Sequence, residues 1–252
     1  MVQNKPVRLA FIADIHGNLP AFERVLADLE HEGVDRIVCL GDVAVGAQPV
    51  ETIERLRAVG CPTIMGNWDA CMLGAVPKVD GEIAEMLVDA CTWSTARLSP
   101  EQLEYVRTFV DTLELQLDDG TSVLAFHGSP RSYDEGIFAT TPDDDVEQML
   151  AGHDAAVYVC GHTHFQLFRR FGESAIINVG SVGQPFRRRR RGVMHISPWA
   201  EYCVFTTEDG RLSVDFRRTP IDVELFTRTM LASGMPHADW WAEHWTPEVP
   251  TG

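Results

Sequence analysis

Seven polar side chains carry the donor atoms that metal ions prefer, and each follows a short apolar run of the chain. They are Asp14, His16, Asp42, Asn67, His127, His162 and His164. The set comprises four imidazoles, two carboxylates and one amide, with no thiolate. That composition disfavours a structural zinc site, because such sites are usually rich in sulfur and closed. Seven donors are enough to hold two metal ions.

The spacing of these residues allows them to converge. Residues i and i+2 of an extended segment point to the same side. Asp14 and His16 can therefore face one ion, and His162 and His164 can face one site. Ligands of open α/β sheets bind at the carboxyl ends of the strands. We expect all seven donors to emerge there, at one edge of the fold.

The donor types indicate the chemistry. Mixed imidazole and carboxylate ligation suits manganese, iron, cobalt, nickel or zinc. Two such ions about 3.5–4 Å apart can hold a bridging water, lower its pKa toward ~7 and neutralise phosphate oxygens. The residues therefore predict metal-assisted hydrolysis of a phosphate ester.

Strands and helices alternate through the first third of the chain. Short apolar runs separated by amphipathic helices indicate buried parallel strands. The expected strands cover 7–13, 36–40 and 61–65, and the expected helices cover 19–31 and 50–59. The stretch from 70 to 110 interrupts this rhythm and predicts two or three helices, with a helix start at Ser99.

The second half of the chain favours antiparallel pairing. Turn signals at Asp119-Gly120 and Asp209-Gly210 predict two hairpins. Further strands are expected at 113–117, 122–126, 155–160, 175–179, 193–196, 202–206 and 212–216. Together the elements predict an α/β sandwich of two sheets flanked by helices. We expect a single domain over 1–252, with a helical insert at about 70–110.

Composition limits the class of protein. A net charge of -16 argues against a general nucleic-acid or acidic-membrane binder. No apolar stretch approaches the ~20 residues that span a bilayer. The six cysteines form no CxxC pair, and Cys39 and Cys160 lie in apolar strands, which predicts free thiols in a reducing compartment. The first residues lead directly into a strand, so we expect no cleaved leader and a cytoplasmic location.

The ordered motifs Asp-x-His, Gly-Asp, Gly-Asn, His and Gly-His-Thr-His resemble those of the calcineurin-like metallophosphoesterase superfamily. Residues 178–185, Asn-Val-Gly-Ser-Val-Gly-Gln-Pro, are similar to the small bacterial and archaeal phosphodiesterase branch of that family. The resemblance runs from Leu9 to about Val223. It implies a four-layer αββα sandwich.

The resemblance also implies roles for the donors. It assigns Asp14, His16 and His164 to one metal ion. It assigns Asn67, His127 and His162 to the other, with Asp42 bridging. The implied cofactors are two divalent transition-metal ions, manganese first, with iron, nickel, cobalt and zinc as alternatives. Asp42, Asn67 and His127 are the expected catalytic residues around a metal-activated hydroxide, and Asn67 would stabilise the developing charge.

One position departs from the family pattern. The usual Gly-Asn-His-Asp reads Gly66-Asn67-Trp68-Asp69 here. An indole N–H is a hydrogen-bond donor but not an acid, so it cannot protonate the leaving group. Such an acid is worth about 10²–10⁴ in rate. Relatives without this histidine tend to favour phosphodiesters, so the resemblance predicts a phosphodiesterase acting on a small phosphate ester, with nucleotides among the candidates.

Two further residues are candidates for substrate binding. Trp68 is either a packing residue or a platform for a base or aryl group. Arg187 begins a run of five arginines that reads either as a solvated loop or as a source of one phosphate contact. The C-terminal Trp240, Trp241 and Trp245 are expected to pack a helix on the body or on a second subunit, which leaves a homo-oligomer open. The histidines outside the motifs are expected at the surface or in packing: His31, His153, His195, His237 and His244.

Other classes of protein could share parts of this pattern. A phosphomonoesterase or serine-threonine protein phosphatase would use the same donors. A non-catalytic scaffold of the same fold, such as the related retromer subunit, would have lost metal donors, whereas all seven are present here. A nucleic-acid-binding module is disfavoured by the acidic charge.

Overall fold

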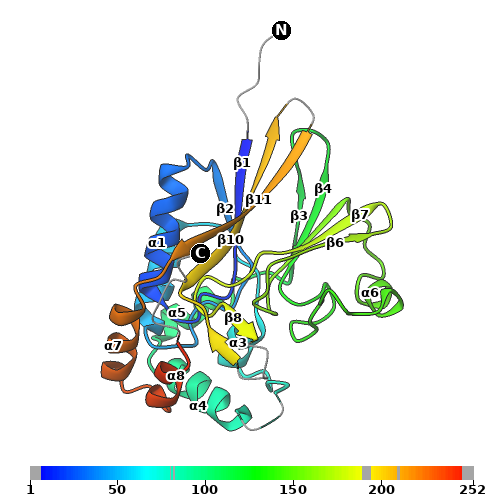
Figure 1. Ribbon diagram of the computed structural model, residues 1–252. Helices are drawn as coiled ribbons and strands as arrows, with labels where there is room; N and C mark the ends of the chain where they lie inside the picture. The colour runs from blue at the N-terminus through cyan, green and yellow to red at the C-terminus, as the bar shows by residue number, and fades with distance from the viewer. Residues whose placement is uncertain (1–6, 80, 82, 189–193, 209–210, 246–252) are drawn as a thin grey trace.

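Two β-sheets pack face to face in the computed structural model, which describes residues 7–79, 81, 83–188, 194–208 and 211–245 (Figure 1). Helices cover the outer faces of the sheets (Figure 1). The predicted α/β sandwich is confirmed. No helix within these ranges is long and apolar enough to cross a bilayer.

The first sheet has the strand order β11-β10-β1-β2. Its strands are β1 (Val7–Ile12), β2 (Arg36–Cys39), β10 (Trp199–Glu208) and β11 (Arg211–Pro220). β1 runs parallel to β2 and antiparallel to β10. Because side chains alternate along a strand, Leu9 and Phe11 join the core between the sheets. Ala10 and Ile12 instead pack in the helix-covered outer core.

The second sheet has the strand order β3-β4-β5-β7-β6. Its strands are β3 (Thr112–Gln116), β4 (Ser122–Phe126), β5 (Val157–Cys160), β6 (Leu167–Phe171) and β7 (Ser174–Asn178). The three central strands are parallel and both edges are antiparallel. Val123 and Ala125 face the first sheet. Leu124 and Phe126 pack in the opposite layer with Val146 of α6 (Asp143–Met149).

The remaining helices lie on the first sheet's side of the molecule. They are α1 (Leu19–His31), α2 (Pro49–Val59), α3 (Asn67–Met72), α4 (Ala84–Thr95), α5 (Pro100–Val106), α7 (Val223–Ser233) and α8 (Ala238–Glu243). The stretch expected to be two or three helices contains α3, α4 and α5. α5 begins at Ser99, where Ser99 and Gln102 cap each other reciprocally. α4, α7 and α8 gather at the bottom of the view in Figure 1.

The expected strand at 61–65 was wrong. This segment forms only two isolated bridges, Cys39 with Thr63 and Ile64 with Val110. Pro62 has no N–H to donate to a ladder, and the chain turns into α3 directly after Gly66. The run is therefore too short to become a strand.

Two strands were not expected from the sequence. β6 is an edge strand whose Arg169 and Arg170 hide the apolar alternation. β8 (Phe186–Arg188) pairs with β9 (Met194–Ile196), so the arginine run begins in a strand and not in a loop. Residues 189–193 and the turn Asp209-Gly210 lie outside the described residues, although β10 and β11 pair as that hairpin requires. All six cysteines are free, and Cys39 and Cys160 are buried.

Candidate metal centre

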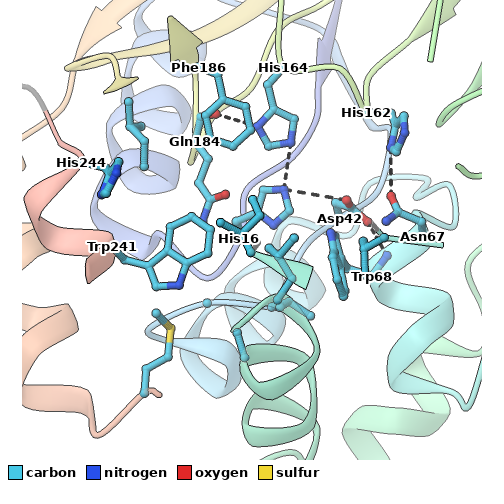
Figure 2. Close-up of a pocket in the computed structure, with 18 of the residues that line it drawn as sticks. His16, Asp42, Asn67, Trp68, His162, His164, Gln184, Phe186, Trp241 and His244 are labelled. Carbon is cyan, nitrogen blue, oxygen red and sulfur yellow. Dashed lines mark hydrogen bonds and ion pairs between the residues drawn. The ribbon is translucent and has the colours of Figure 1, made fainter. Parts of the chain in front are cut away.

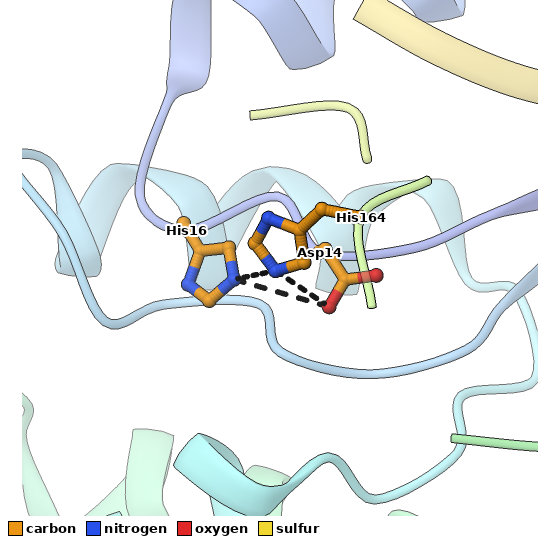
Figure 3. A group of neighbouring side chains, drawn as sticks. All are labelled: Asp14, His16 and His164. Atoms are coloured by element: carbon orange, nitrogen blue, oxygen red, sulfur yellow. Dashed lines mark hydrogen bonds and ion pairs between the residues drawn. The ribbon is translucent and has the colours of Figure 1, made fainter. Parts of the chain in front are cut away.

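The structure brings all seven predicted donors together where four parallel strands end. Asp14 and His16 follow β1, Asp42 follows β2, His127 follows β4, and the two later histidines follow β5. Asn67 is the first residue of α3. Two groups of donors result, and within each the ligand atoms lie within 4.8 Å of one another. The first group is Asp14, His16 and His164 (Figure 3); the second is Asp42, His127 and His162.

The backbone is strained at these residues. Among the described residues, six non-glycine residues have a positive φ, and five of them are predicted donors: Asp14, His16, Asp42, His162 and His164. The left-handed conformation costs an L-residue roughly 1–2 kcal/mol. Backbone bonds between the loops stabilise it, such as Asp14 N to the Gly41 carbonyl at 2.9 Å and His16 N to the Asp42 carbonyl at 3.0 Å. His237 is the sixth. Strain concentrated in one cluster of polar residues indicates a functional site.

The first group points three electron pairs toward one position. Nε2 of His164 lies 3.3 Å from Oδ1 of Asp14 and 3.1 Å from Nε2 of His16. Nδ1 of His164 lies 2.6 Å from the Gln184 carbonyl, which can only accept, so Nδ1 carries the proton. When the ring is neutral, as a metal ligand must be, Nε2 carries the free lone pair beside the carboxylate (Figure 3). This is the tautomer that a metal-binding histidine adopts. Without metal, burial lowers the pKa of His164, but Asp14 outweighs burial and raises that pKa.

The second group is oriented in the same way. Nδ1 of His127 donates to the Leu40 carbonyl at 2.7 Å, and Nε2 of His162 donates to the Asp134 carbonyl at 3.2 Å. The other ring nitrogen of each histidine lies 3.0 Å from Oδ1 of Asn67. Backbone carbonyls therefore fix both rings with a lone pair facing the amide oxygen.

Asp42 lies between the two groups. Its Oδ2 is 3.8 Å from Nε2 of His16 and 3.4 Å from Nε2 of His127. Its Oδ1 accepts a hydrogen bond from the Trp68 backbone at 2.8 Å (Figure 2). One carboxylate oxygen thus faces both groups, which is the position a bridging ligand would take.

The residues fit a pair of cations. Oδ1 of Asp14 is buried and has no hydrogen-bond partner. Nε2 of His127 faces oxygen atoms of Asp42 and Asn67, and such an arrangement of electron pairs is stable only around a positive charge. Burial lowers the pKa of His127, but Asp42 outweighs burial and raises that pKa to about 10. Without metal the charge is therefore a proton, and divalent ions would replace it.

The pKa values of the other donors reflect the same two effects, burial and the charge of neighbouring donors. Burial would raise the pKa of Asp14 and Asp42, but His164 and His127 outweigh it and hold both values below their ordinary range. Burial and the nearby charge of His164 lower the pKa of His16 to about 4. Burial and His127 lower the pKa of His162 likewise to about 4. Both of these rings are neutral at pH 7 and available as ligands.

Asp69 supports the site and was missed from the sequence. Its buried carboxylate accepts hydrogen bonds from the backbone N–H of Asp42 at 2.7 Å, of Val43 at 3.0 Å and of Gly66 at 3.0 Å. It therefore ties the Asp42 loop to the start of α3. Burial and the charge of Asp42 raise its pKa to about 7. An acidic residue in the first turn of a helix is usually interpreted as a cap. Only its place as the last residue of the Gly-Asn-x-Asp motif could have indicated that it supports the site.

The segment at 178–185 supports the site from the opposite side. The Asn178 amide donates to Thr163 Oγ1 at 3.1 Å and to the Gly161 carbonyl. The Ser181 hydroxyl donates to the Asp14 carbonyl at 2.8 Å. These bonds hold the loops after β5 and β1, so the motif acts as a scaffold beneath the ligands.

A cavity of about 220 Å³ opens beside the donors (Figure 2). Trp68 lines it, although only 7% of this residue is exposed. Trp241 and His244 also line it, so these two residues do more than the packing expected for them. Phe186 lies at its edge and stacks on His164 with ring centroids 4.6 Å apart. Arg187 follows Phe186 in β8, but its side chain lies outside the described part of the structure.

Comparison with known proteins gives matches over most of the chain. Residues 7–201 match the family model of the calcineurin-like phosphoesterase superfamily domain. Protein MJ0912 of Methanocaldococcus jannaschii is 28% identical over 261 residues, which cover 93% of this chain and 96% of that protein. Phosphodiesterase YfcE of Escherichia coli is 30% identical over 190 residues, which cover 71% of this chain and 81% of YfcE.

Solved structures match the fold as well. A metallophosphoesterase from Sphaerobacter thermophilus superposes with a TM-score of 0.73 at 26% identity, covering 94% of this chain and 97% of that one. Protein PH1004 from Pyrococcus horikoshii gives a TM-score of 0.77 at 19% identity, covering 96% and 99%. The second likeness concerns the fold alone.

Replacing Asp69 tests its supporting role. Asp69→Asn keeps the size of the side chain but presents an amide to three backbone donors. We expect the free energy of unfolding of the metal-free protein to fall by about 2–3 kcal/mol, because an amide nitrogen would replace one of the two oxygens that accept from buried backbone N–H groups. The measurement is urea denaturation. The matched control is Asp154→Asn in an exposed loop, which should change stability by no more than about 0.5 kcal/mol. Equal effects of the two substitutions would show that Asp69 does not support the loops.

Proposed function

The chain belongs to the calcineurin-like phosphoesterase superfamily, and from this premise we propose that it is a phosphodiesterase holding two divalent metal ions. The family implies divalent ions, and the structure has two candidate groups of buried donors. The observation that carries the proposal is the place of Asp42, whose Oδ2 faces both groups at once. The similarity to phosphodiesterase YfcE supports the choice of a diester.

In this proposal each donor has one task. Asp14, His16 and His164 hold one ion; Asn67, His127 and His162 hold the other; Asp42 contacts both. Two ions held there would activate a water molecule as the nucleophile and neutralise the phosphate oxygens. Manganese is the first choice for both, with iron, nickel, cobalt and zinc as alternatives, since all accept imidazole and carboxylate ligands.

The protein's own contribution is to orient buried ligands. The carbonyls of Gln184, Leu40 and Asp134 fix the tautomers of three histidines, so the ligands need no rearrangement when a substrate binds. Asp14 and His127 are fully buried. Electrostatic stabilisation of the transition state is stronger in such surroundings than in water.

Trp68 sets the preference for diesters in this proposal. It occupies the position at which the family usually has a histidine, and its backbone N–H is bonded to Asp42. The indole cannot protonate a leaving group. Esters with acidic leaving groups need little protonation of the leaving group. The leaving group of an alkyl monoester is a basic alkoxide, which needs a proton. A monoesterase remains the second candidate, because it would use the same donors.

Metal content tests the dinuclear proposal. We expect two manganese ions per chain in protein saturated with manganese and freed of excess. Asp42→Ala should lose metal from both groups and lower kcat/KM for bis(4-nitrophenyl) phosphate by at least about 10³-fold, because charge stabilisation by metal ions is worth several kcal/mol. The measurements are elemental analysis and steady-state kinetics, with Asp154→Ala as control. One ion per chain in the saturated wild type would refute the dinuclear centre.

Trp68→His tests the origin of diester preference. The substitution places a titratable group beside the site, so kcat/KM for an alkyl monoester should rise about tenfold or more while that for the diester changes little. Trp68→Phe is the matched control, since it keeps an aromatic ring without an acid. The readout is the diester-to-monoester ratio of kcat/KM at matched metal loading. A ratio that the histidine and phenylalanine variants change equally would show that Trp68 acts by packing.

A further inference from the structure

The cavity beside the donors extends beyond the space that faces them. One end is walled by the donors themselves, including His16, Asp42 and His164. The other end is lined by apolar side chains from α4 and from two consecutive helices near the end of the chain: Leu87 of α4, Met230 of α7 and Trp241 of α8. Figure 1 shows these helices side by side, and Figure 2 shows the Trp241 ring reaching toward the donors. The end of the cavity that faces the donors, the donor end, therefore continues directly into an apolar end.

The side chains at the apolar end are held in place by their packing. Trp241 is 4% exposed and Met230 is 2% exposed, and both belong to the same buried cluster as Trp68. Trp240 meets Trp241 edge to face with centroids 5.0 Å apart, and His244 stacks on Trp240 at 3.8 Å. Nδ1 of His244 donates to the Trp240 carbonyl at 2.7 Å. The Trp241 ring is thus fixed by its neighbours before any ligand arrives.

The apolar end offers little charge to a ligand. Outside the donor groups, the described lining includes one lysine and one further carboxylate, Lys78 and Asp134, and these two pair with each other at 3.6 Å. A second phosphate or another strongly charged group would find no free partner among these residues. The group bound here should therefore be uncharged.

The lining favours a ring over an alkyl chain. Trp68 and Trp241 present aromatic surfaces, and Met230 and Met235 add sulfur atoms, which contact aromatic rings favourably. Stacking and sulfur–ring contacts of this kind are available to an aromatic ring and not to an alkyl chain.

From these observations we infer that the apolar end binds an aromatic substituent of the substrate, so that the substrate class is an aryl or heteroaryl phosphodiester. The inference rests on the proposed function, because the donor end must hold the phosphate. A nucleobase and a simple aryl group share the chemistry of a flat aromatic ring, and the experiment separates them.

Calorimetric titration of manganese-loaded protein with phosphonates tests the subsite. The probes are methylphosphonate, hexylphosphonate, phenylphosphonate and a methylphosphonate that carries thymine. Phenylphosphonate should bind at least about tenfold more tightly than methylphosphonate, because the ring removes apolar area from water. Its binding should also show a more negative heat-capacity change. Tighter binding of the thymine probe than of phenylphosphonate would identify a nucleobase subsite, and the reverse order would identify a simple aryl subsite.

Two variants and one control test whether the apolar end causes the preference for phenylphosphonate over methylphosphonate. Trp241→Ala should reduce the phenyl-to-methyl ratio of affinities to within about threefold, as expected when most of the ring's contact area is lost. Leu87→Phe fills the cavity from α4 without removing a buried tryptophan, and it should weaken phenylphosphonate more than methylphosphonate. Trp93→Ala is the control, because Trp93 lines a different surface of α4 and should leave the ratio unchanged.

The outcomes separate the subsite from the proposed function. Equal affinity for methyl- and phenylphosphonate in a protein that hydrolyses bis(4-nitrophenyl) phosphate would overturn the subsite and leave the phosphodiesterase intact. Hexylphosphonate binding as tightly as phenylphosphonate would overturn the aromatic preference. A selective response to phenylphosphonate without hydrolysis of any diester would overturn the function and retain the subsite.

Discussion

Burial of two carboxylates at the ends of adjacent strands is the constraint on which the rest of the site depends. Asp14 and Asp42 are removed from solvent, and an ionised carboxylate in the interior is stable only beside positive charge. His127 and His164, whose pKa values are raised, supply that charge as protons when metal is absent, and they would be neutral as metal ligands. The left-handed loops and the Asp69 carboxylate serve the same end, because they hold the donors against their mutual repulsion.

Local sequence patterns were sufficient for the sandwich and for the convergence of the seven candidate donors. Buried strands such as β1 and β5 are largely apolar runs. A donor directly after such a run must lie at the carboxyl end of the strand, where ligands bind. Patterns failed where an element is defined by its partner. β6 is an edge strand with two arginines. At residues 61–65, Pro62 and the turn into α3 prevent a regular strand from forming. Asp69 was missed because its role appears only when the Asp42 loop lies beside it.

The cavity could not be read from the sequence for a different reason. Its apolar end is assembled from α4 and from the consecutive helices α7 and α8, which follow α4 by more than a hundred residues along the chain. Amphipathic periodicity shows that each helix buries one face, but it does not show that a part of the three faces stays open to a cavity. Trp241 illustrates this. It packs on the body as expected, and yet it also lines the space beside the metal donors.

α3 connects the two halves of the site. Asn67, Trp68 and Asp69 are consecutive; they are in turn a candidate donor, a part of the cavity wall and the anchor of the Asp42 loop. A substrate group that packs on Trp68 therefore contacts the element that positions Asn67 and Asp42. Binding energy from a remote apolar group can in this way be used to hold the phosphate in its reactive position. The same packing would displace water from around the donors and strengthen their electrostatic effect on the reaction. An apolar wall beside a highly charged centre is thus consistent with catalysis, since each part improves the surroundings of the other.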